Sequence, residues 1–205
     1  MTHRRLVLAS TSPFRRELLA RLGLPFEAVA PEVDETPAPG ESAGRLVVRL
    51  AEAKARAVAD RFPDALIIGS DQVAALDGAI LGKPGGRGRA IEQLSRASGR
   101  TVVFCTGLCL LRTADGRAQT ACEVFKVHFR RLSAAQIEAY VDREQPFGCA
   151  GSFKSEGLGI ALFEHLEGAD PNALIGLPLI RLVDMLSAAG VEVLADRGEV
   201  GGSGV

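Results

Sequence analysis

The chain has 205 residues, 47% of them hydrophobic, which is enough for one large α/β domain with a buried core. Its 24 Lys and Arg residues nearly balance its 25 Asp and Glu residues. No net positive field is therefore available to hold the protein on nucleic acid or on an anionic membrane, and we expect any phosphate recognition to be local.

The apolar runs, the cysteines and the histidines argue against further classes of protein. No apolar run approaches the roughly 20 residues of a membrane span, and residues 10–13 interrupt the first run before a signal-peptide core is reached, so we expect a cytoplasmic protein. The four cysteines include no Cys-x-x-Cys pair and the three histidines are far apart, which argues against a zinc cage or a disulfide framework. Cys105 and Cys109, evenly spaced in an apolar run, are interpreted as core residues.

Strands and helices alternate in the first part of the chain. Residues 5–9 form a short apolar run typical of a buried strand, and the following helix has its leucines on one stripe and stops at Gly23. Residues 26–30 are a second strand candidate. After the polar, proline-bearing loop 31–42, residues 43–62 carry the longest helical pattern of the chain.

The middle of the chain predicts hairpins. Residues 65–70 indicate a short buried strand that ends at Asp71 and Gln72. Residues 73–84 indicate two short strands around the turn Asp77–Gly78, which has the composition of a tight hairpin loop.

A second, longer hairpin and two further helices follow. A helix is predicted at about residues 88–97. Residues 101–132 predict a long antiparallel hairpin that turns at Asp115–Gly116. Residues 133–143 open with a serine cap and continue as a helix. Strand-helix alternation combined with two hairpins predicts a mixed sheet.

The C-terminal part combines a glycine-rich loop with a last helix. The loop at residues 148–159 has the composition of a functional loop. Pro178 is well placed to open a final helix that stops at Gly190. Residues 198–205 have nothing to bury and are expected to be disordered.

The turn between the first strand and the first helix has the composition of an anion site. With Pro13 as the first helical residue, Ser12 is the N-cap, and backbone N–H groups point out of the positive end of the helix. The turn adds hydroxyl and guanidinium groups from Ser10, Thr11, Ser12, Arg15 and Arg16. Together these groups suit a di- or triphosphate. The alternative is that Ser12 only caps the helix and the arginines only solvate it.

Two lysines lie where a phosphate chain would reach. Lys54 is on or beside the apolar face of the helix at 43–62, and Lys83 is in a glycine-containing loop. Taken alone, either lysine is typical of a solvated surface charge. No Gly-x-x-x-x-Gly-Lys-Ser/Thr motif is present in the sequence, which argues against an ATP-driven P-loop machine.

Carboxylates supply the other half of a candidate hydrolase site. Glu32, Asp34 and Glu35 cluster in the loop after the second strand, and Asp71 is predicted at the carboxyl end of a buried strand, where α/β sheets place ligands. Triphosphate cleavage needs a divalent cation held by hard oxygen ligands and a base for the attacking water. The cluster suits the first role and Asp71 the second. The alternative is that the three acidic residues only keep the loop soluble and that Asp71 only caps a turn.

Seven motifs occur in one order and spacing along nearly the whole chain: STSPFRRELL, PEVDE, RLAEAKA, IIGSDQV, GKP, CAGSFKSEGLGI and GLPLIRLVDML. In this combination they resemble the Maf family of nucleoside triphosphate pyrophosphatases. An aromatic residue after Ser-Pro, glutamine after the aspartate and AGSFKSEG resemble the subgroup that hydrolyses 7-methyl-GTP. The dTTP/UTP subgroup would carry arginine, threonine and glutamine at the three corresponding positions.

The resemblance implies an activity and an architecture. The activity is attack at the α-phosphate, which gives a nucleoside monophosphate and pyrophosphate with the help of a divalent cation, Mg²⁺ or Mn²⁺. The architecture is an α/β fold with a mixed twisted sheet flanked by helices, similar to inosine triphosphatase, with two lobes around a central cleft. Residues 1–197 would form this single two-lobed domain, as a homodimer.

The resemblance also implies roles for residues. It assigns catalysis to Asp71, as proton acceptor, with Lys54 and Lys83. It matches Ser10, Arg15, Phe14, Gln72 and Glu156 to substrate binding and Glu35 to the metal. The turn itself adds Ser12 and Arg16 to the predicted substrate-binding residues, and Asp71 is predicted as a second metal ligand. Phe14, at a position where the subgroup commonly has tryptophan, would stack on the cationic 7-methylguanine, and Glu156 would accept hydrogen bonds from its N1–H and N2–H₂ groups.

Two other functions are compatible with the same residues. One is the same hydrolysis on another nucleotide, such as dTTP, UTP or a damaged nucleotide. The other is a nucleotide-binding regulator of cell division without turnover, because the family is linked to septum formation. Nucleic-acid binding is disfavoured by the near-zero net charge.

Overall fold

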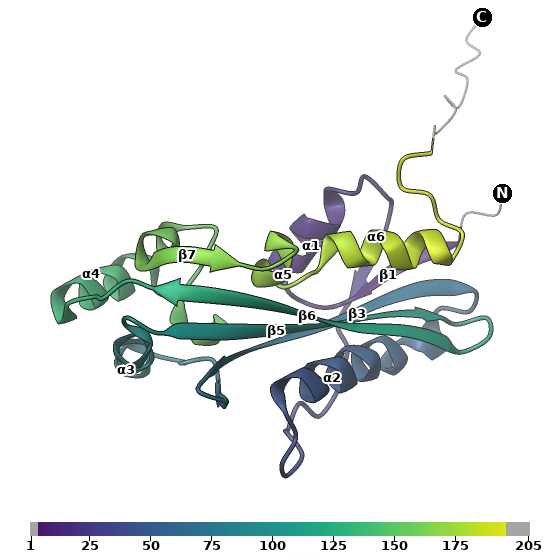
Figure 1. The fold of residues 1–205 in the computed structure, drawn as a ribbon. Coiled ribbons are helices and arrows are strands. Elements are labelled where there is room, and N and C mark those ends of the chain that lie inside the picture. The colour runs from purple at the N-terminus through teal and green to yellow at the C-terminus, as the bar shows by residue number, and fades with distance from the viewer. Residues whose placement is uncertain (1–3, 196–205) are drawn as a thin grey trace, which may run out of the picture.

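A computed structural model describes residues 4–195, whose centre is a twisted seven-stranded sheet with helices on both faces (Figure 1). The strands are β1 (Arg5–Ala9), β2 (Glu27–Val29), β3 (Ala65–Leu76), β4 (Ala79–Leu81), β5 (Thr101–Arg112), β6 (Arg117–Phe129) and β7 (Phe163–Glu167). The helices are α1 (Pro13–Ala20), α2 (Ala43–Ala57), α3 (Arg87–Ala97), α4 (Ala134–Glu144), α5 (Pro171–Ile175) and α6 (Leu179–Ala188). Short 3₁₀ turns are η1 (Ala59–Arg61), η2 (Ala150–Ser152) and η3 (Leu158–Leu162).

The sheet is mixed, as predicted. The strand order is β2-β1-β3-β5-β6-β7, and β4 pairs with β3 outside this path. β1 is parallel to both β2 and β3, whereas the other pairs are antiparallel. α2 covers one face of the half that contains β1, and α1 and α6 cover the other face, while α3 and α4 lie at the opposite end (Figure 1). Within the described residues, no helix is both long and apolar enough to cross a membrane.

Local signals in the sequence explain several element boundaries. The Ser12 side chain accepts a hydrogen bond from the Arg15 N–H and caps α1, and Pro13 is the first residue of that helix, both as predicted. Ser133 and Gln136 form a complete capping box at the start of α4. Asp77 and Gly78 both have positive φ, which is the requirement of the two-residue turn that joins β3 to β4.

The prediction that the strand beginning at residue 65 ends at Asp71 and Gln72 is wrong. β3 runs without interruption from Ala65 to Leu76, so Asp71 and Gln72 are internal strand residues. The reason is the partner strand, because β5 pairs with β3 continuously from Leu66 to Ala75 and supplies backbone hydrogen bonds on both sides of Asp71.

Two elements near the C-terminus were not predicted. β7 pairs with the end of β6, and the short helix α5 begins at Pro171 with Asp170 as its N-cap. The final helix α6 begins directly after Pro178, and Gly190 follows its end with a φ of 83°, as predicted for a helix stop. The predicted disordered tail at 198–205 lies outside the described residues.

The helix α2 lies unusually close to the sheet. Cβ atoms built on Gly69 of β3 and Gly107 of β5 would be 2.0 and 2.1 Å from backbone carbonyl oxygens of α2, at Ala51 and Val47. Because real Cβ atoms do not approach an oxygen so closely, only glycine permits this contact. The approach sets the depth at which the side chains of α2 enter the site.

Candidate active site

A cleft opens where β1 ends. β1 pairs with β3 only as far as Ala9 opposite Gly69, and β4 joins the same edge of β3 only from Ala74 onward. In the described part of the chain, residues 70–73 of β3 therefore have no strand neighbour on that edge. A cavity of about 590 Å³ lies at this gap, and it is lined by both Asp71 and Gln72. This volume is in the usual range for a small-molecule site.

The N-terminal turn of α1 forms one wall of the cleft. Ser10 is buried, and its Oγ accepts a hydrogen bond from the Ser12 N–H at 3.1 Å. Arg15 is held by a hydrogen bond from its Nε to the Gly176 carbonyl oxygen at 2.8 Å. Burial lowers the pKa of the Arg15 guanidinium from its ordinary value, and the carboxylates of Asp71 and Glu35 oppose that shift. The turn thus places a fixed cation in the cleft.

A lysine between two carboxylates forms the centre of the site. Lys54 and Asp71 are 7% and 8% exposed, and Lys54 Nζ lies 2.6 Å from Asp71 Oδ1 and 2.6 Å from Glu35 Oε1. Lys54 continues the stripe of Leu46 and Leu50 on the buried face of α2, as the helical spacing predicted. The hydrogen bond from Lys54 lowers the pKa of Glu35, partial burial opposes this shift, and the charges of Lys54 and Lys83 add to it. A lysine buried to this degree needs such partners.

The charges that line the cavity balance before any ligand is present. Arg15, Lys54 and Lys83 oppose Glu35, Asp71 and Glu156. A nucleoside triphosphate would therefore add several negative charges that these cations, already paired in part, do not neutralise.

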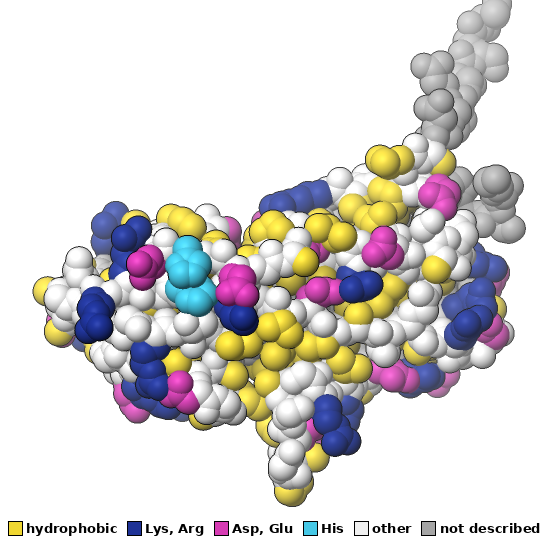
Figure 2. Space-filling view, viewed as in Figure 1, with side chains coloured by type: hydrophobic (Ala, Val, Ile, Leu, Met, Phe, Trp, Pro, Cys, Tyr) yellow, Lys and Arg dark blue, Asp and Glu magenta, His cyan; other side chains and the backbone are white. Residues whose placement is uncertain are grey.

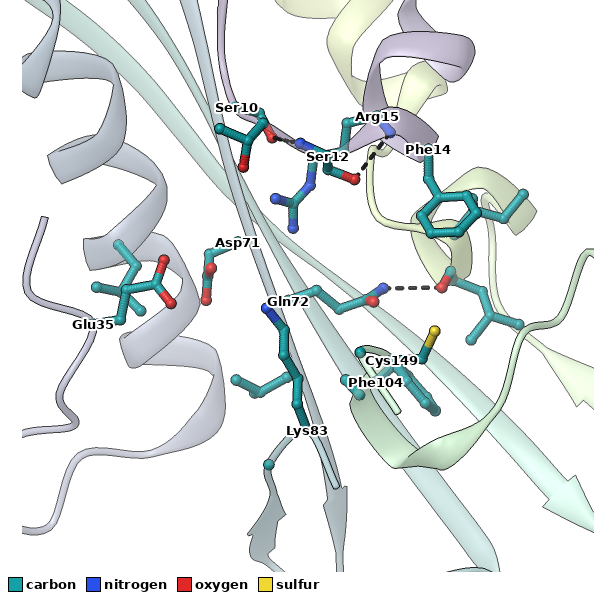
Figure 3. Close-up of a pocket in the computed structure, with 18 of the residues that line it drawn as sticks. Ser10, Ser12, Phe14, Arg15, Glu35, Asp71, Gln72, Lys83, Phe104 and Cys149 are labelled. Atoms are coloured by element: carbon teal, nitrogen blue, oxygen red, sulfur yellow. Dashed lines mark hydrogen bonds between the residues drawn. The ribbon is translucent and has the colours of Figure 1, made fainter. Parts of the chain in front are cut away.

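The acidic residues fit a divalent cation that is shared with a substrate. Glu35 and Asp71 point their carboxylates toward one another (Figure 3) and already converge on one cation, the Lys54 ammonium. Two carboxylates are a typical protein contribution to a magnesium site that is completed by phosphate oxygens and water. Among the described residues, no group of three or more acidic, histidine or cysteine side chains is arranged as a metal site. Glu32 and Asp34 are exposed and do not line the cavity.

The far end of the cavity is apolar and aromatic, with one carboxylate. Phe14 at the start of α1 lies across from the strands that carry Gln72 and Phe104 (Figure 3). Phe104 and Phe153 pack edge to face, with ring centroids 5.2 Å apart, and both line the cavity. Glu156, from the glycine-rich loop predicted at 148–159, lines the cavity together with Cys149 of that loop, which lies beside Phe104 (Figure 3). A flat, partly apolar group with hydrogen-bond donors on its edge would fit this end.

Nearly all the predicted site residues meet in this one cavity. Its lining includes Ser10, Ser12, Phe14, Arg15, Glu35, Lys54, Asp71, Gln72, Lys83 and Glu156. Arg16 is exposed on α1 and does not line the cavity. The prediction missed α5, whose backbone carbonyls hold Gln72, the Gly176 carbonyl directly after it, which holds Arg15, and Thr106 on β5. No local signal marks a threonine in the middle of an apolar strand as part of a site.

The Glu35–Lys54 contact makes a prediction for pH dependence. Because the folded-state pKa of Glu35 is below 4.5, the contact stabilises the fold fully above that pH, and its contribution is lost as the pH falls through the folded-state pKa. Glu35→Gln should lower the free energy of unfolding at neutral pH by less than about 1 kcal/mol, because the Glu35 side chain is 56% exposed. Urea unfolding of both proteins should show that this difference shrinks in acid. A difference that persists undiminished would contradict the assignment.

The fold and the cleft together define an α/β protein with a capped turn that carries hydroxyls and Arg15, a buried Lys-Asp pair and aromatic side chains in one cavity. Residues 5–189 match the model of the family described as Maf-like protein, so the chain belongs to the Maf family.

Curated relatives and a solved structure agree with that membership. A 7-methyl-GTP pyrophosphatase of Nitrosococcus oceani is 62% identical over 92% of this chain and 95% of its own length. A protein of the same name from Pseudomonas aeruginosa is 59% identical over 92% of this chain and 98% of its own length. A HAM1 protein from Coxiella burnetii has the same general fold, with a TM-score of 0.51 and 14% identity over 90% of this chain and 99% of that chain.

Proposed function

We propose that this protein is a nucleoside triphosphate pyrophosphatase that hydrolyses 7-methyl-GTP to 7-methyl-GMP and pyrophosphate, and so removes a modified nucleotide. The observation that carries the proposal is the buried Lys54–Asp71 pair beside Arg15 in a cavity with an aromatic far end. The relatives named 7-methyl-GTP pyrophosphatase support the choice of substrate.

In this proposal the α1 turn and the lysines bind the triphosphate. Arg15, Lys54 and Lys83 are the cations of the cavity, and the hydroxyls of Ser10 and Ser12 are next to them. Charge-assisted hydrogen bonds to phosphate oxygens are the strong kind, and they would hold the α-phosphate near Asp71.

The chemical step is attack of one water molecule on the α-phosphorus. Asp71 Oδ1 accepts a hydrogen bond from Lys54, which leaves its second carboxylate oxygen for the water proton. The new bond joins the water oxygen to the α-phosphorus, and the bond from that phosphorus to the bridging oxygen breaks. The products are the nucleoside monophosphate and pyrophosphate, and the lysines balance the charge of the leaving pyrophosphate.

We propose that Glu35 and Asp71 bind a divalent cation, Mg²⁺ or Mn²⁺, together with the substrate. Such a cation would supply positive charge to the phosphate oxygens, and the charge balance of the free cavity supports this need. Lys54 would hold both carboxylates turned to the same point.

The far end of the cavity would select the base. Guanine methylated at N7 is cationic, and stacking on Phe14 adds a cation–π contribution of about 0.5 to 2 kcal/mol. Glu156 would accept hydrogen bonds from N1–H and N2–H₂ and would complement the positive ring. A pyrimidine without that donor edge would leave the carboxylate unpaired.

An assay of pyrophosphate release tests the proposal. With Mg²⁺ or Mn²⁺, the purified protein should convert 7-methyl-GTP to one pyrophosphate and one 7-methyl-GMP, and removal of the metal with EDTA should stop turnover until metal is restored. GTP, UTP and dTTP should react more slowly. Equal rates on UTP and 7-methyl-GTP would refute the base preference, and no release from any nucleotide would favour a regulator without turnover.

We also propose a cytoplasmic homodimer, on the resemblance to the family and because nucleoside triphosphates are cytoplasmic metabolites. Val124 on β6 and Ile180 on α6 are about half exposed, and hydrophobic side chains gather near the middle of β6 (Figure 2). An exposed apolar surface of this kind supports association. Light scattering over a range of concentrations would test for the dimer, and a monomer mass throughout would refute it.

A further inference from the structure

The side chain of Gln93 on α3 connects two segments that line the cavity. Its Oε1 accepts a hydrogen bond from Ser152 Oγ at 2.5 Å, and its Nε2 donates to the Gly82 carbonyl oxygen at 3.0 Å. These two bonds are the Gln93 bridge. Because a backbone carbonyl only accepts, the bond to Gly82 fixes which end of the amide faces Ser152. Gln93 itself does not line the cavity, so it acts on the cavity only through these two segments.

Ser152 depends on the bridge because of its backbone conformation and its burial. Its φ is 62°, in the left-handed region, which is unfavourable for a residue with a Cβ atom. Its side chain is fully buried, and among residues 4–195 Gln93 is the only hydrogen-bond partner of its hydroxyl. Gly151 before it also has a positive φ, and glycine resists rotation little. Without Gln93, the buried hydroxyl would lose its acceptor and the turn would be free to leave this conformation.

The turn at Ser152 shapes the aromatic end of the cavity. Cys149 and Phe153, on either side of the turn, both line the cavity. Cys149 lies beside Phe104 (Figure 3), and Phe153 packs edge to face on the same Phe104 ring. A Cβ atom built on Gly151 would be 3.1 Å from that ring, so the turn itself is packed against Phe104. A rotation of the turn would therefore change the wall that faces the base.

The other bond of the Gln93 bridge lies beside a cation of the cavity. Gly82 directly precedes Lys83, and both residues line the cavity. Lys83 extends from the loop after β4 into the site (Figure 3). Because the bridge holds the Gly82 carbonyl, it limits the movement of a lysine that binds the triphosphate in the proposed function.

Other hydrogen bonds hold the same loop but not this turn. The Phe147 carbonyl oxygen accepts from the Gly85 N–H at 2.9 Å, and the Lys154 N–H donates to the Tyr140 hydroxyl at 3.1 Å. These bonds flank Ser152 and leave its φ unrestrained. They should keep the loop attached when the bridge is removed, so we expect variants of the bridge to fold and to change the wall locally.

We infer that Gln93 is a positioning residue for nucleotide selection, because its two bonds fix the wall that faces the base relative to the loop that carries Lys83. The inference rests on the proposed function. The ligand concerned is a nucleoside triphosphate, which would reach the aromatic end and Lys83 at the same time. Asp71 and Lys54 belong to β3 and α2, so loss of the bridge should weaken recognition of the nucleotide more than the chemical step.

Ser152→Ala and Gln93→Met separate the two halves of the bridge. Alanine removes only the bond to the turn, whereas methionine keeps the length of glutamine and removes both bonds. In calorimetry we expect Kd for 7-methyl-GMP to rise about tenfold in both variants, and Kd for tripolyphosphate, which has no base, to rise about threefold in Gln93→Met alone. The double variant should bind 7-methyl-GMP no more weakly than Gln93→Met. An unchanged 7-methyl-GMP affinity in Gln93→Met, or an equal loss of tripolyphosphate affinity in both variants, would overturn the inference.

Kinetics and a conservative variant distinguish positioning from a general loss of structure. In both variants KM for 7-methyl-GTP should rise with less than about a threefold change in kcat, and the preference for 7-methyl-GTP over UTP in kcat/KM should fall about tenfold. Gln93→Glu can still accept from Ser152, so in about 0.3 M salt, which screens the added charge, its Kd for 7-methyl-GMP should be within about twofold of wild type. Glu92→Met, at an exposed neighbouring position on α3, should change none of these values. A failed rescue by glutamate, or a loss in kcat with KM unchanged, would overturn the inference.

Amide hydrogen exchange on the free protein tests the bridge without turnover. In mass spectrometry, peptides that cover residues 148–153 and 79–86 should both exchange at least about threefold faster in Gln93→Met than in the wild type. Only the first segment should exchange faster in Ser152→Ala, and neither in Glu92→Met. Unchanged exchange of both segments in Gln93→Met would overturn the inference. If the wild type hydrolyses no nucleotide but the exchange follows this pattern, the proposed function fails and the bridge stands.

Discussion

Asp71→Asn should lower kcat for nucleotide hydrolysis by about 10²- to 10⁴-fold, which is the usual contribution of a positioned general base. Asparagine has the same shape as aspartate but takes no proton from water. Asp71 is 8% exposed and is held by Lys54 at 2.6 Å. Solvent therefore cannot readily take over the role of this carboxylate as the base. Pyrophosphate release under saturating 7-methyl-GTP measures the effect.

Measurements of the fold and of the nucleotide affinity of Asp71→Asn distinguish a loss of catalysis from a loss of structure. Calorimetry should still detect 7-methyl-GMP binding, because Phe14 and Glu156 are untouched. Asp142→Asn is the matched control, since Asp142 is an exposed carboxylate paired with Arg87, and its loss should leave kcat unchanged. Activity of Asp71→Asn near the wild-type level would remove Asp71 from the role of base.

Gly107→Ala should have the largest effect on stability, a loss of about 3 kcal/mol or more in the free energy of unfolding. The added Cβ would lie 2.1 Å from the Val47 carbonyl oxygen and 2.3 Å from its carbonyl carbon. Backbone atoms of a packed helix cannot move aside cheaply, so α2 must lift from the sheet. Because α2 carries Lys54 to Asp71, the fraction that remains folded should also lose activity.

Urea unfolding followed by circular dichroism measures this loss. The matched control is Gly88→Ala, a glycine on α3 whose Cβ would meet nothing within 4 Å. That change should raise stability by about 0.5 to 1 kcal/mol, because alanine is the better helix former. If Gly107→Ala unfolds at the same urea concentration as the wild type, the close approach of α2 to β5 is not as described.

Much of the fold was predictable because its signals are local. Ser12 and Pro13 start α1, Ser133 starts α4, and Asp77–Gly78 turns the short hairpin, each through contacts among residues at most a few positions apart. Capping and turn chemistry work at this range in any fold. The mixed sheet followed from the order of those elements.

The misassigned end of β3 shows what local sequence signals cannot predict. A polar pair at Asp71 and Gln72 is typical of a strand end, but β5 pairs with the chain on both sides of it. The continuous pairing depends on a strand that begins thirty residues later in the chain, at Thr101, which a short window cannot register. The short elements β7 and α5 were missed for a related reason, since their few residues carry little periodicity of their own.

By itself, the sequence determined which residue types this protein has for its chemistry: a capped turn with hydroxyls and arginines, lysines on a helix and in a loop, an acidic loop and an Asp-Gln pair. Only the tertiary structure decided how they meet. β1 stops at Ala9 and leaves an open gap beside β3, so neighbouring side chains from opposite faces enter one cavity. Lys54 and Asp71 are 17 residues apart, and Gln72 and Ala173 are 101 apart. Contacts of that separation exist only after the helices and strands have packed, because no propensity of a short segment encodes them.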